Sequence, residues 1–239
     1  MIYLRNIAFY LVFYGGSIGL VIAAVVAARI APGRVRGICD AWSALHHWAC
    51  ERLLGIRIVE TGERPDRQCF YAIKHESFFE AIGIPHLFDH PALFAKQELF
   101  DIPGWGRAAR RFGAIPVKRE EGARALRTMI REARPYVEDG RPIVIFPEGT
   151  RVPHGTHPPL GAGFAALYKL LDLPVVPVAV DSGPLYHHLW KRAGTITIHF
   201  GEPIEPGLPR KEIEARTHAG LNRLNEHRGV ERVPPAETP

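Results

Sequence analysis

The sequence predicts an α/β fold in which a mostly parallel central sheet is flanked by helices. Residues 69–73 and 143–146 are short, uninterrupted apolar runs with β-branched and aromatic members, which is typical of strands buried on both faces. After residue 54, such runs alternate with segments of helical spacing, which favours βαβ units. Both runs end abruptly at charged residues, and reactive groups in parallel sheets gather beyond the carboxyl ends of the strands. We therefore expect one site at that edge of the sheet.

The length and the charge distribution favour one such domain with an anionic partner. At 239 residues the chain is long enough for one α/β domain with a sizeable core. The net charge is +5, and residues 107–134 alone contribute +6 through nine cations and three anions. This local excess favours anionic lipid, a phosphorylated substrate or an acidic carrier protein over nucleic acid, because neither stacking aromatics nor a nucleic-acid-binding motif accompanies it. The three cysteines lack the spacing of a disulfide framework or a zinc site.

Residues 1–55 are expected to anchor the chain to a membrane through two helices. Residues 7–28 carry no charge and, as a helix, would extend about 33 Å, enough for a hydrocarbon core of roughly 30 Å. The three arginines within residues 29–36 argue against a signal peptide and favour a cytoplasmic position for the rest of the chain. A buried core helix is the alternative. Residues 38–54 form the second helix candidate, in which Trp42 and Trp48 suit the headgroup layer.

The remaining elements follow in a regular order. We expect strands near residues 57–60, 69–73, 92–95, 114–117, 143–146, 175–180 and 195–200. We expect helices near residues 78–88, 104–111, 121–138, 162–171 and 210–227. Residues 56–229 then form the α/β domain, and the proline-containing residues 230–239 form a tail that is expected to be disordered.

His75 and Glu80 follow the first buried run at the spacing of a catalytic pair. Imidazole titrates near neutral pH and can take the proton of an attacking alcohol, while a carboxylate on its far nitrogen fixes the tautomer and stabilises the imidazolium. The alternative for Glu80 is structural, because residues 77–80 also form a capping box in which Glu80 accepts from the amide of Ser77. A carboxylate can fill both roles. Glu76 is a competing partner, although it would have to fold back onto the ring.

The two polar motifs resemble those of the glycerolipid acyltransferases. Residues 75–80 look like the family's His-x-x-x-x-acid motif, with Glu80 where the family usually has Asp, and residues 146–151 match its Phe-Pro-Glu-Gly-Thr-Arg hexapeptide. The resemblance covers about residues 62–200. It implies transfer of a fatty acyl group from acyl carrier protein or coenzyme A to the 2-hydroxyl of 1-acylglycerol 3-phosphate, which gives phosphatidate. His75 would be the base and Glu80 its support, with no other cofactor and no metal.

The resemblance also implies residues that bind the phosphate of the acceptor. Residues 113–119 are similar to the family's second block, whose final arginine, here Arg119, receives that phosphate. A guanidinium suits this role because its planar fork can donate two hydrogen bonds to a phosphate. The other candidates are Arg151 as a second cation, Glu148 to orient cations or the hydroxyl, Gly149 for close approach of the backbone, Thr150 beside it, and Lys96, at a position that is often basic in relatives.

Several alternatives stay open at the level of the sequence. The acceptor could be another lysolipid, such as a lyso-ornithine lipid. The chain could instead be a lipid hydrolase that works through Ser77 or another serine, or a lipid-binding protein without catalytic activity. If the chain transfers an acyl group to 1-acylglycerol 3-phosphate, its partners are membrane lipid, lysophosphatidate and the acyl thioester. The resemblance also implies a location at the bacterial inner membrane, with the catalytic domain on the cytoplasmic side.

Overall fold

One seven-stranded sheet forms the centre of the molecule. The computed structural model describes residues 1–118 and 122–225, and for Ala123 the backbone alone. The strands are β1 (Ile56–Thr61), β2 (Phe70–Ile73), β3 (Ala92–Lys96), β4 (Ala114–Val117), β5 (Ile143–Ile145), β6 (Val175–Val180) and β7 (Gly194–Phe200). They lie in the order β1-β7-β6-β2-β5-β3-β4, and every neighbouring pair is parallel except β6 with β7. The expected mostly parallel sheet is confirmed.

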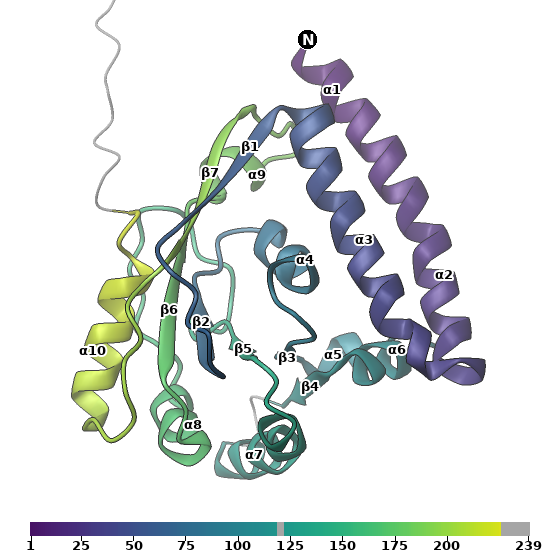
Figure 1. The fold of residues 1–239 in the computed structure, drawn as a ribbon. Coiled ribbons are helices and arrows are strands. Elements are labelled where there is room, and N and C mark those ends of the chain that lie inside the picture. Colours follow the sequence, from purple (N-terminus) through teal and green to yellow (C-terminus); the bar gives the residue numbers. More distant parts are fainter. Residues whose placement is uncertain (119–121, 226–239) are drawn as a thin grey trace, which may run out of the picture.

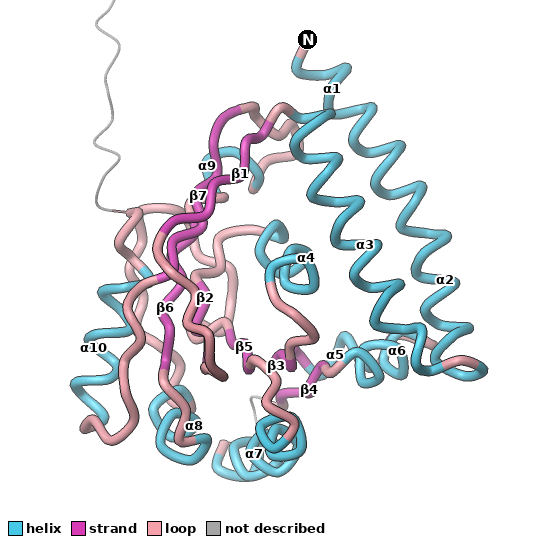
Figure 2. The backbone as a smooth tube through the Cα atoms, in the orientation of Figure 1, coloured by secondary structure: helices cyan, strands magenta, loops and turns pink. Residues whose placement is uncertain are grey.

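Helices cover both faces of this sheet (Figures 1 and 2). One face packs against α7 (Ala123–Glu138), α8 (Phe164–Leu171) and α10 (Arg210–Leu221). The other face packs against α3 (Val35–Ala49), α4 (Phe78–Leu87) and α9 (Gly183–Tyr186). Strand β2 shows why both faces are apolar: Phe70 and Ala72 belong to the first core, whereas Tyr71 and Ile73 belong to the second, because successive side chains of a strand point to opposite faces.

The chain begins with one long helix. It comprises α1 (Ile2–Phe9), a π-helical turn (Tyr10–Tyr14) and α2 (Gly15–Ile30), which together run for 29 residues without a break. This is longer than the 22 residues expected, and by length and composition it could cross a membrane. A short turn (Pro32–Arg34) leads into α3, which returns alongside α2 and continues into a second π-helical segment (Cys50–Leu54). Two helices were expected here, and two helices form.

The remaining expected strands and helices are found within a few residues of their predicted limits. Helix α6 (Trp105–Phe112) packs against α2 and α3 and follows the short α5 (Gln97–Phe100), which the sequence did not predict. Helix α9 was also not predicted. Helix α10 ends at Leu221 rather than at residue 227. The tail expected at residues 230–239 lies outside the described residues.

Candidate active site

The two sequence motifs meet at one edge of the sheet. Strands β2 and β5 are parallel neighbours, so the residues that follow them emerge at the same edge. The amide of Val152 donates a hydrogen bond to the carbonyl oxygen of His75 (2.8 Å). The imidazole of His75 stacks on the ring of Phe146, with the ring centroids 4.1 Å apart. The histidine motif and the Phe-Pro-Glu-Gly-Thr-Arg loop therefore form one site, as expected.

His75 and Glu80 face each other in this site. The Nδ1 atom of His75 lies 3.4 Å from Oε2 of Glu80. The side chain of His75 is 15% exposed, whereas that of Glu80 is 2% exposed. This geometry directs Nδ1 of the imidazole to the carboxylate and leaves Nε2 as the nitrogen that can exchange a proton with a substrate. The distance is long for a hydrogen bond, and such contacts often tighten when substrate binds.

Glu80 also forms the capping box, and a serine from a distant segment holds it. Its Oε2 atom accepts a hydrogen bond from the amide of Ser77 (3.0 Å), and the hydroxyl of Ser77 caps the start of α4. The hydroxyl of Ser182 donates to Oε1 of Glu80, and the hydroxyl oxygens of Ser77 and Ser182 are 2.8 Å apart. Ser182 is fully buried. The structural and the catalytic reading of Glu80 are thus compatible.

Sequence reasoning missed Ser182, although a signal for it was present. Ser182 follows β6, and β6 lies next to β2 in parallel, so both strands end at the same edge. The sequence Asp-Ser-Gly at residues 181–183 directly follows the buried run 175–180, in the same way that polar residues follow the run 69–73. The rule that selected His75 would have selected Ser182 if the order of the strands had been known.

Glu76 points away from His75. Its Oε1 atom lies 2.9 Å from Nδ1 of His154, and its Oε2 atom accepts a hydrogen bond from the amide of Gly183 (2.8 Å). Burial raises the pKa of Glu76 to about 8, with a smaller contribution from the nearby carboxylate of Glu80. Glu76 therefore connects the loops that follow β2, β5 and β6, and Glu80 is the carboxylate that faces the imidazole.

Lys74 and Glu148 form a buried ion pair behind the site. The ammonium group of Lys74 donates to Oε1 of Glu148 (2.6 Å), to Oδ1 of Asn222 (2.9 Å) and to the carbonyl oxygen of Thr156 (3.1 Å). The second oxygen of Glu148 accepts from the amide of His75 (3.3 Å). Both carboxylate oxygens are therefore engaged inside the protein. In this geometry Glu148 orients the ammonium group of Lys74 and positions the backbone of His75, while its predicted role toward the hydroxyl of the substrate stays a prediction.

Arg151 lies beside the histidine motif. Its Cζ atom sits 4.0 Å from the centroid of the Phe78 ring, and both side chains are exposed. The turn before it explains the position: Gly149 donates to the carbonyl oxygen of Phe146 (3.0 Å) and has a φ of 75°, which favours glycine. Thr150 is exposed between Gly149 and Arg151. The structure thus joins Arg151 to the group of His75 and Glu80.

Arg119 and Lys96 are the two other basic residues that the sequence predicts as phosphate ligands. Arg119 lies outside the described residues, although β4 ends two residues before it at the same edge of the sheet. Lys96 is the last residue of β3, at that edge as well, and its exposed ammonium group pairs with Glu98 (2.8 Å). Within residues 1–118 and 122–225, no group of three or more histidine, cysteine, aspartate or glutamate side chains is arranged to hold a metal ion.

Comparisons with known proteins connect this site to a family. The family model described as "Acyltransferase" matches residues 56–181. A 1-acyl-sn-glycerol-3-phosphate acyltransferase of Pseudomonas aeruginosa is 28% identical over 232 residues, which cover 93% of this chain and 88% of that protein. The human 1-acyl-sn-glycerol-3-phosphate acyltransferase beta is 25% identical over 154 residues, and the match spans 62% of this chain but only 55% of the human protein.

A solved structure shares the fold. The crystal structure of the 1-acyl-sn-glycerophosphate acyltransferase PlsC from Thermotoga maritima superposes with a TM-score of 0.68 and 21% sequence identity. The match covers 95% of this chain and 97% of that one. It therefore includes the N-terminal helices as well as the sheet.

Proposed function

The chain belongs to the acyltransferase family, and from this premise we propose that it transfers a fatty acyl group to the 2-hydroxyl of 1-acylglycerol 3-phosphate, which gives phosphatidate. The observation that carries this proposal is the convergence of His75, Glu80 and Arg151 from two motifs at one edge of the sheet. A base for the hydroxyl and a cation for the phosphate are the two groups that such an acceptor requires. The names of the bacterial and human relatives support the same acceptor.

The proposed reaction needs one proton acceptor and no covalent enzyme intermediate. Nε2 of His75 takes the proton of the 2-hydroxyl while the hydroxyl oxygen attacks the thioester carbonyl. Glu80, on the Nδ1 side, stabilises the imidazolium that forms. When the tetrahedral intermediate collapses, the carbon–sulfur bond breaks and the new carbon–oxygen bond remains. The imidazolium then returns its proton to the departing thiolate, so His75 ends the cycle neutral.

Arg151 is the proposed cation for the phosphate of the acceptor. Its guanidinium lies over the face of Phe78, and a stacked guanidinium keeps the N–H groups at its edge available for a phosphate. The backbone of Gly149 and the hydroxyl of Thr150 precede it in the same loop. Arg119 and Lys96 complete the proposed set by their positions beyond β4 and at the end of β3. The carboxyl ends of β3 and β4 lie at the edge of the sheet that carries His75.

The donor and the location are further parts of the proposal. The acyl donor is a thioester of acyl carrier protein or coenzyme A, and no other cofactor takes part. The helix Ile2–Ile30 exposes large apolar side chains along its length, which supports association with a membrane. We place the protein at the bacterial inner membrane with the catalytic domain on the cytoplasmic side, which the arginines within residues 29–36 favour.

The hydrolase alternative finds no support at Ser77. The hydroxyl of Ser77 is buried, accepts a hydrogen bond from the amide of Phe79 (3.0 Å) and contacts Ser182. A nucleophile needs access to the substrate and a base within reach, and Ser77 instead caps a helix. Another lysolipid, such as a lyso-ornithine lipid, is the second acceptor to test, because it would use the same base.

The proposal is tested by measuring acyl transfer with and without lysophosphatidate. Wild-type protein should consume acyl thioester only when the acceptor is present. His75→Ala should lower kcat by about 1,000-fold, since a general base is lost, while lysophosphatidate still binds. Arg151→Ala should instead raise the KM for lysophosphatidate. Release of free fatty acid without an acceptor, or a clear preference for lyso-ornithine lipid, would overturn the assignment.

A further inference from the structure

A row of arginines lies along the exposed side of α7. Arg124, Arg127, Arg131 and Arg134 are spaced by three or four residues, so they share one side of the helix. The buried residues of α7 lie on the opposite side. The row ends at Glu138, which lies one turn beyond Arg134. Together with Arg110 of α6, these four residues are called the arginine face below.

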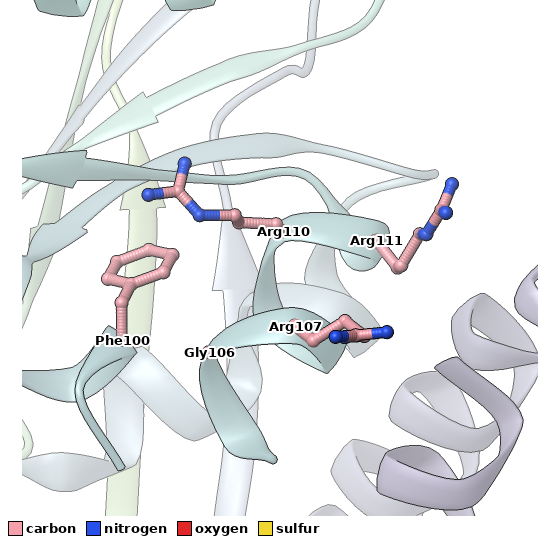
Figure 3. A pocket seen from close by; sticks show the side chains of 5 residues that line it. All are labelled: Phe100, Gly106, Arg107, Arg110 and Arg111. Atoms are coloured by element: carbon pink, nitrogen blue, oxygen red, sulfur yellow. The ribbon is translucent and has the colours of Figure 1, made fainter. Parts of the chain in front are cut away.

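Helix α6 extends the positive charge around the edge strand β4. Arg110 approaches Glu132 of α7 (3.4 Å), and its Cζ atom lies 5.1 Å from the centroid of the Phe100 ring. Figure 3 shows Arg110 reaching over Phe100, while Arg107 and Arg111 leave the same helix on its other side. These residues line an open hollow of about 500 Å³. The basic surface therefore includes both helices that flank β4.

Three of the five residues of the arginine face are not neutralised by the described part of the protein. Among the residues that the structure describes, no acidic side chain forms an ion pair with Arg127, Arg131 or Arg134. The exposed arginines of α10 differ: Arg210 pairs with Glu214, and Arg216 pairs with Glu212. Like charges three or four residues apart destabilise a helix. A general preference for arginine in the chain would not leave Arg127, Arg131 and Arg134 without an ion pair while both arginines of α10 are paired, so the arrangement indicates an anionic partner.

The position of α7 favours a protein partner over the membrane. Helix α7 covers the opposite face of the sheet from α1 and α3 (Figure 1). Its arginines lie on the side of the helix opposite to its buried residues. A membrane that receives the exposed apolar side of the N-terminal helix would lie on the other side of the molecule. The row from Arg124 to Arg134 spans ten residues, about 15 Å of helix. This length suits the surface of a protein better than the phosphates of a single nucleotide.

We propose that the arginine face docks an acidic carrier protein that delivers the acyl group as a thioester. The proposal rests on the proposed acyl transfer and names the donor that the sequence left open. Helix α7 follows β4, whose carboxyl end lies at the same edge of the sheet as His75. A carrier bound along α7 near Arg124 can therefore present its thioester at that edge. Opposite charges on the two surfaces would also accelerate their encounter.

The test compares two donors on one variant. Arg127→Glu/Arg131→Glu should lower kcat/KM for the acyl carrier protein thioester by about tenfold or more, mainly through KM, because two attractive contacts become repulsive. The same variant should use the acyl coenzyme A thioester within about twofold of wild type, which also shows that it is folded. Arg210→Glu/Arg216→Glu changes the net charge equally on α10 and should affect neither donor. Salt should weaken the reaction of the wild type with the carrier protein.

Each other outcome contradicts the docking site. Equal losses with both donors would indicate damage to the site, and no loss with the carrier protein would show that the arginine face is not its contact. Loss of binding to anionic vesicles with unchanged carrier kinetics would assign the face to the membrane. Failure of wild-type protein to acylate lysophosphatidate from either donor would instead overturn the proposed function, so the two failures are distinguishable.

Discussion

At the scale of single residues, the chemistry of the site depends on how Glu80 is held. Its carboxylate is shared by His75, the amide of Ser77 and the hydroxyl of Ser182. These donors stabilise a negative charge that burial alone would disfavour. The longer side chain of glutamate, compared with the aspartate usual at this position, lets one oxygen reach the turn after β6 while the other faces the imidazole. Ser182 is therefore the residue that fixes the orientation of the carboxylate.

Ser182→Ala should lower kcat by about ten- to a hundredfold, because a carboxylate that can rotate no longer holds the imidazole in the reactive geometry. The KM for lysophosphatidate should stay close to that of wild type, since Ser182 is buried behind the site. Steady-state kinetics measure both effects.

Ser43→Ala is the matched control for this variant. Ser43 is also fully buried, and its hydroxyl donates to the carbonyl oxygen of Ile82 (2.7 Å) and accepts from the amide of His86 (3.2 Å), both in α4. Each of the two substitutions should lower the free energy of unfolding by about 1–3 kcal/mol, because each leaves a buried polar group unpaired. Only Ser182→Ala should change kcat. Equal kinetics in the two variants would show that Ser182 is merely structural.

Glu76 should make the stability of the protein depend on pH. Its pKa is raised from 4.5 to about 8, chiefly by burial, so the folded chain keeps a proton that the unfolded chain loses within that range. The contribution to the free energy of unfolding is therefore complete below about pH 4.5 and is lost as the pH rises through about 8. The side chain of Glu76→Gln stays neutral. Its free energy of unfolding should therefore rise by up to about 5 kcal/mol relative to that of wild type as the pH increases through this range.

Unfolding in urea at several pH values measures this difference. Glu63→Gln removes an exposed carboxylate and should give a difference from wild type that does not change with pH. A difference between Glu76→Gln and wild type that is also constant with pH would show that Glu76 is ionised in the folded protein throughout, paired with His154.

At the scale of the elements, Lys74 connects three segments that are distant in sequence. Its ammonium group binds Glu148 after β5, the carbonyl oxygen of Thr156 in the following loop and Asn222 at the end of α10. All three donor positions of the ammonium group are filled, which is the condition under which a buried charge is tolerated. Because Glu148 also accepts a hydrogen bond from the amide of His75, the same ion pair positions the backbone of His75.

Lys74→Met should lower the free energy of unfolding by about 3–5 kcal/mol, because the buried carboxylate of Glu148 loses its counter-ion. Adding Glu148→Gln should restore part of this loss, since the unpaired charge disappears. Thermal or urea unfolding measures both values. Lys169→Met, which changes an exposed lysine on α8, serves as the control and should have little effect. A loss below about 1 kcal/mol for Lys74→Met would show that this ion pair adds little to stability.

The same residues show what could be predicted from the sequence. The strands and most helices follow from apolar runs and their spacing, which are local properties of the chain. The pair His75 and Glu80 is also local, because one capping box brings the two side chains together. The partners Ser182 and Asn222 are not local: they reach Glu80 and Lys74 only through the position of β6 beside β2 and of α10 over the sheet. Strand order is a tertiary property, so sequence reasoning missed these contacts and the buried role of Glu148.

At the scale of the whole molecule, two chemically different surfaces lie on opposite sides of the sheet. The N-terminal helix packs small residues, including Ala24, Ala27 and Ala28, against α6 and the start of α3. Its other side exposes large apolar side chains, of which Ile18 is 64% and Ile22 is 58% exposed. Such an apolar surface is unfavourable in water and favourable in lipid. The four α7 residues of the arginine face lie on the opposite sheet face. The active-site edge therefore lies between an apolar and a basic surface, which suits a reaction between a lipid acceptor and a water-soluble donor.

Ile18→Lys/Ile22→Lys should therefore release the protein from membranes. A lysine within the hydrocarbon layer costs about 2.5–3.5 kcal/mol, so two of them should shift most of the protein to the soluble fraction in a liposome flotation assay. The buried side of the helix is unchanged, so acyl transfer to lysophosphatidate dispersed in detergent should remain near the level of wild type. Leu170→Lys is the control, because Leu170 is 54% exposed but lies on α8, on the other face of the sheet. If the double variant still floats with liposomes, or if Leu170→Lys is released equally, the exposed side of the N-terminal helix is not the surface that enters the lipid.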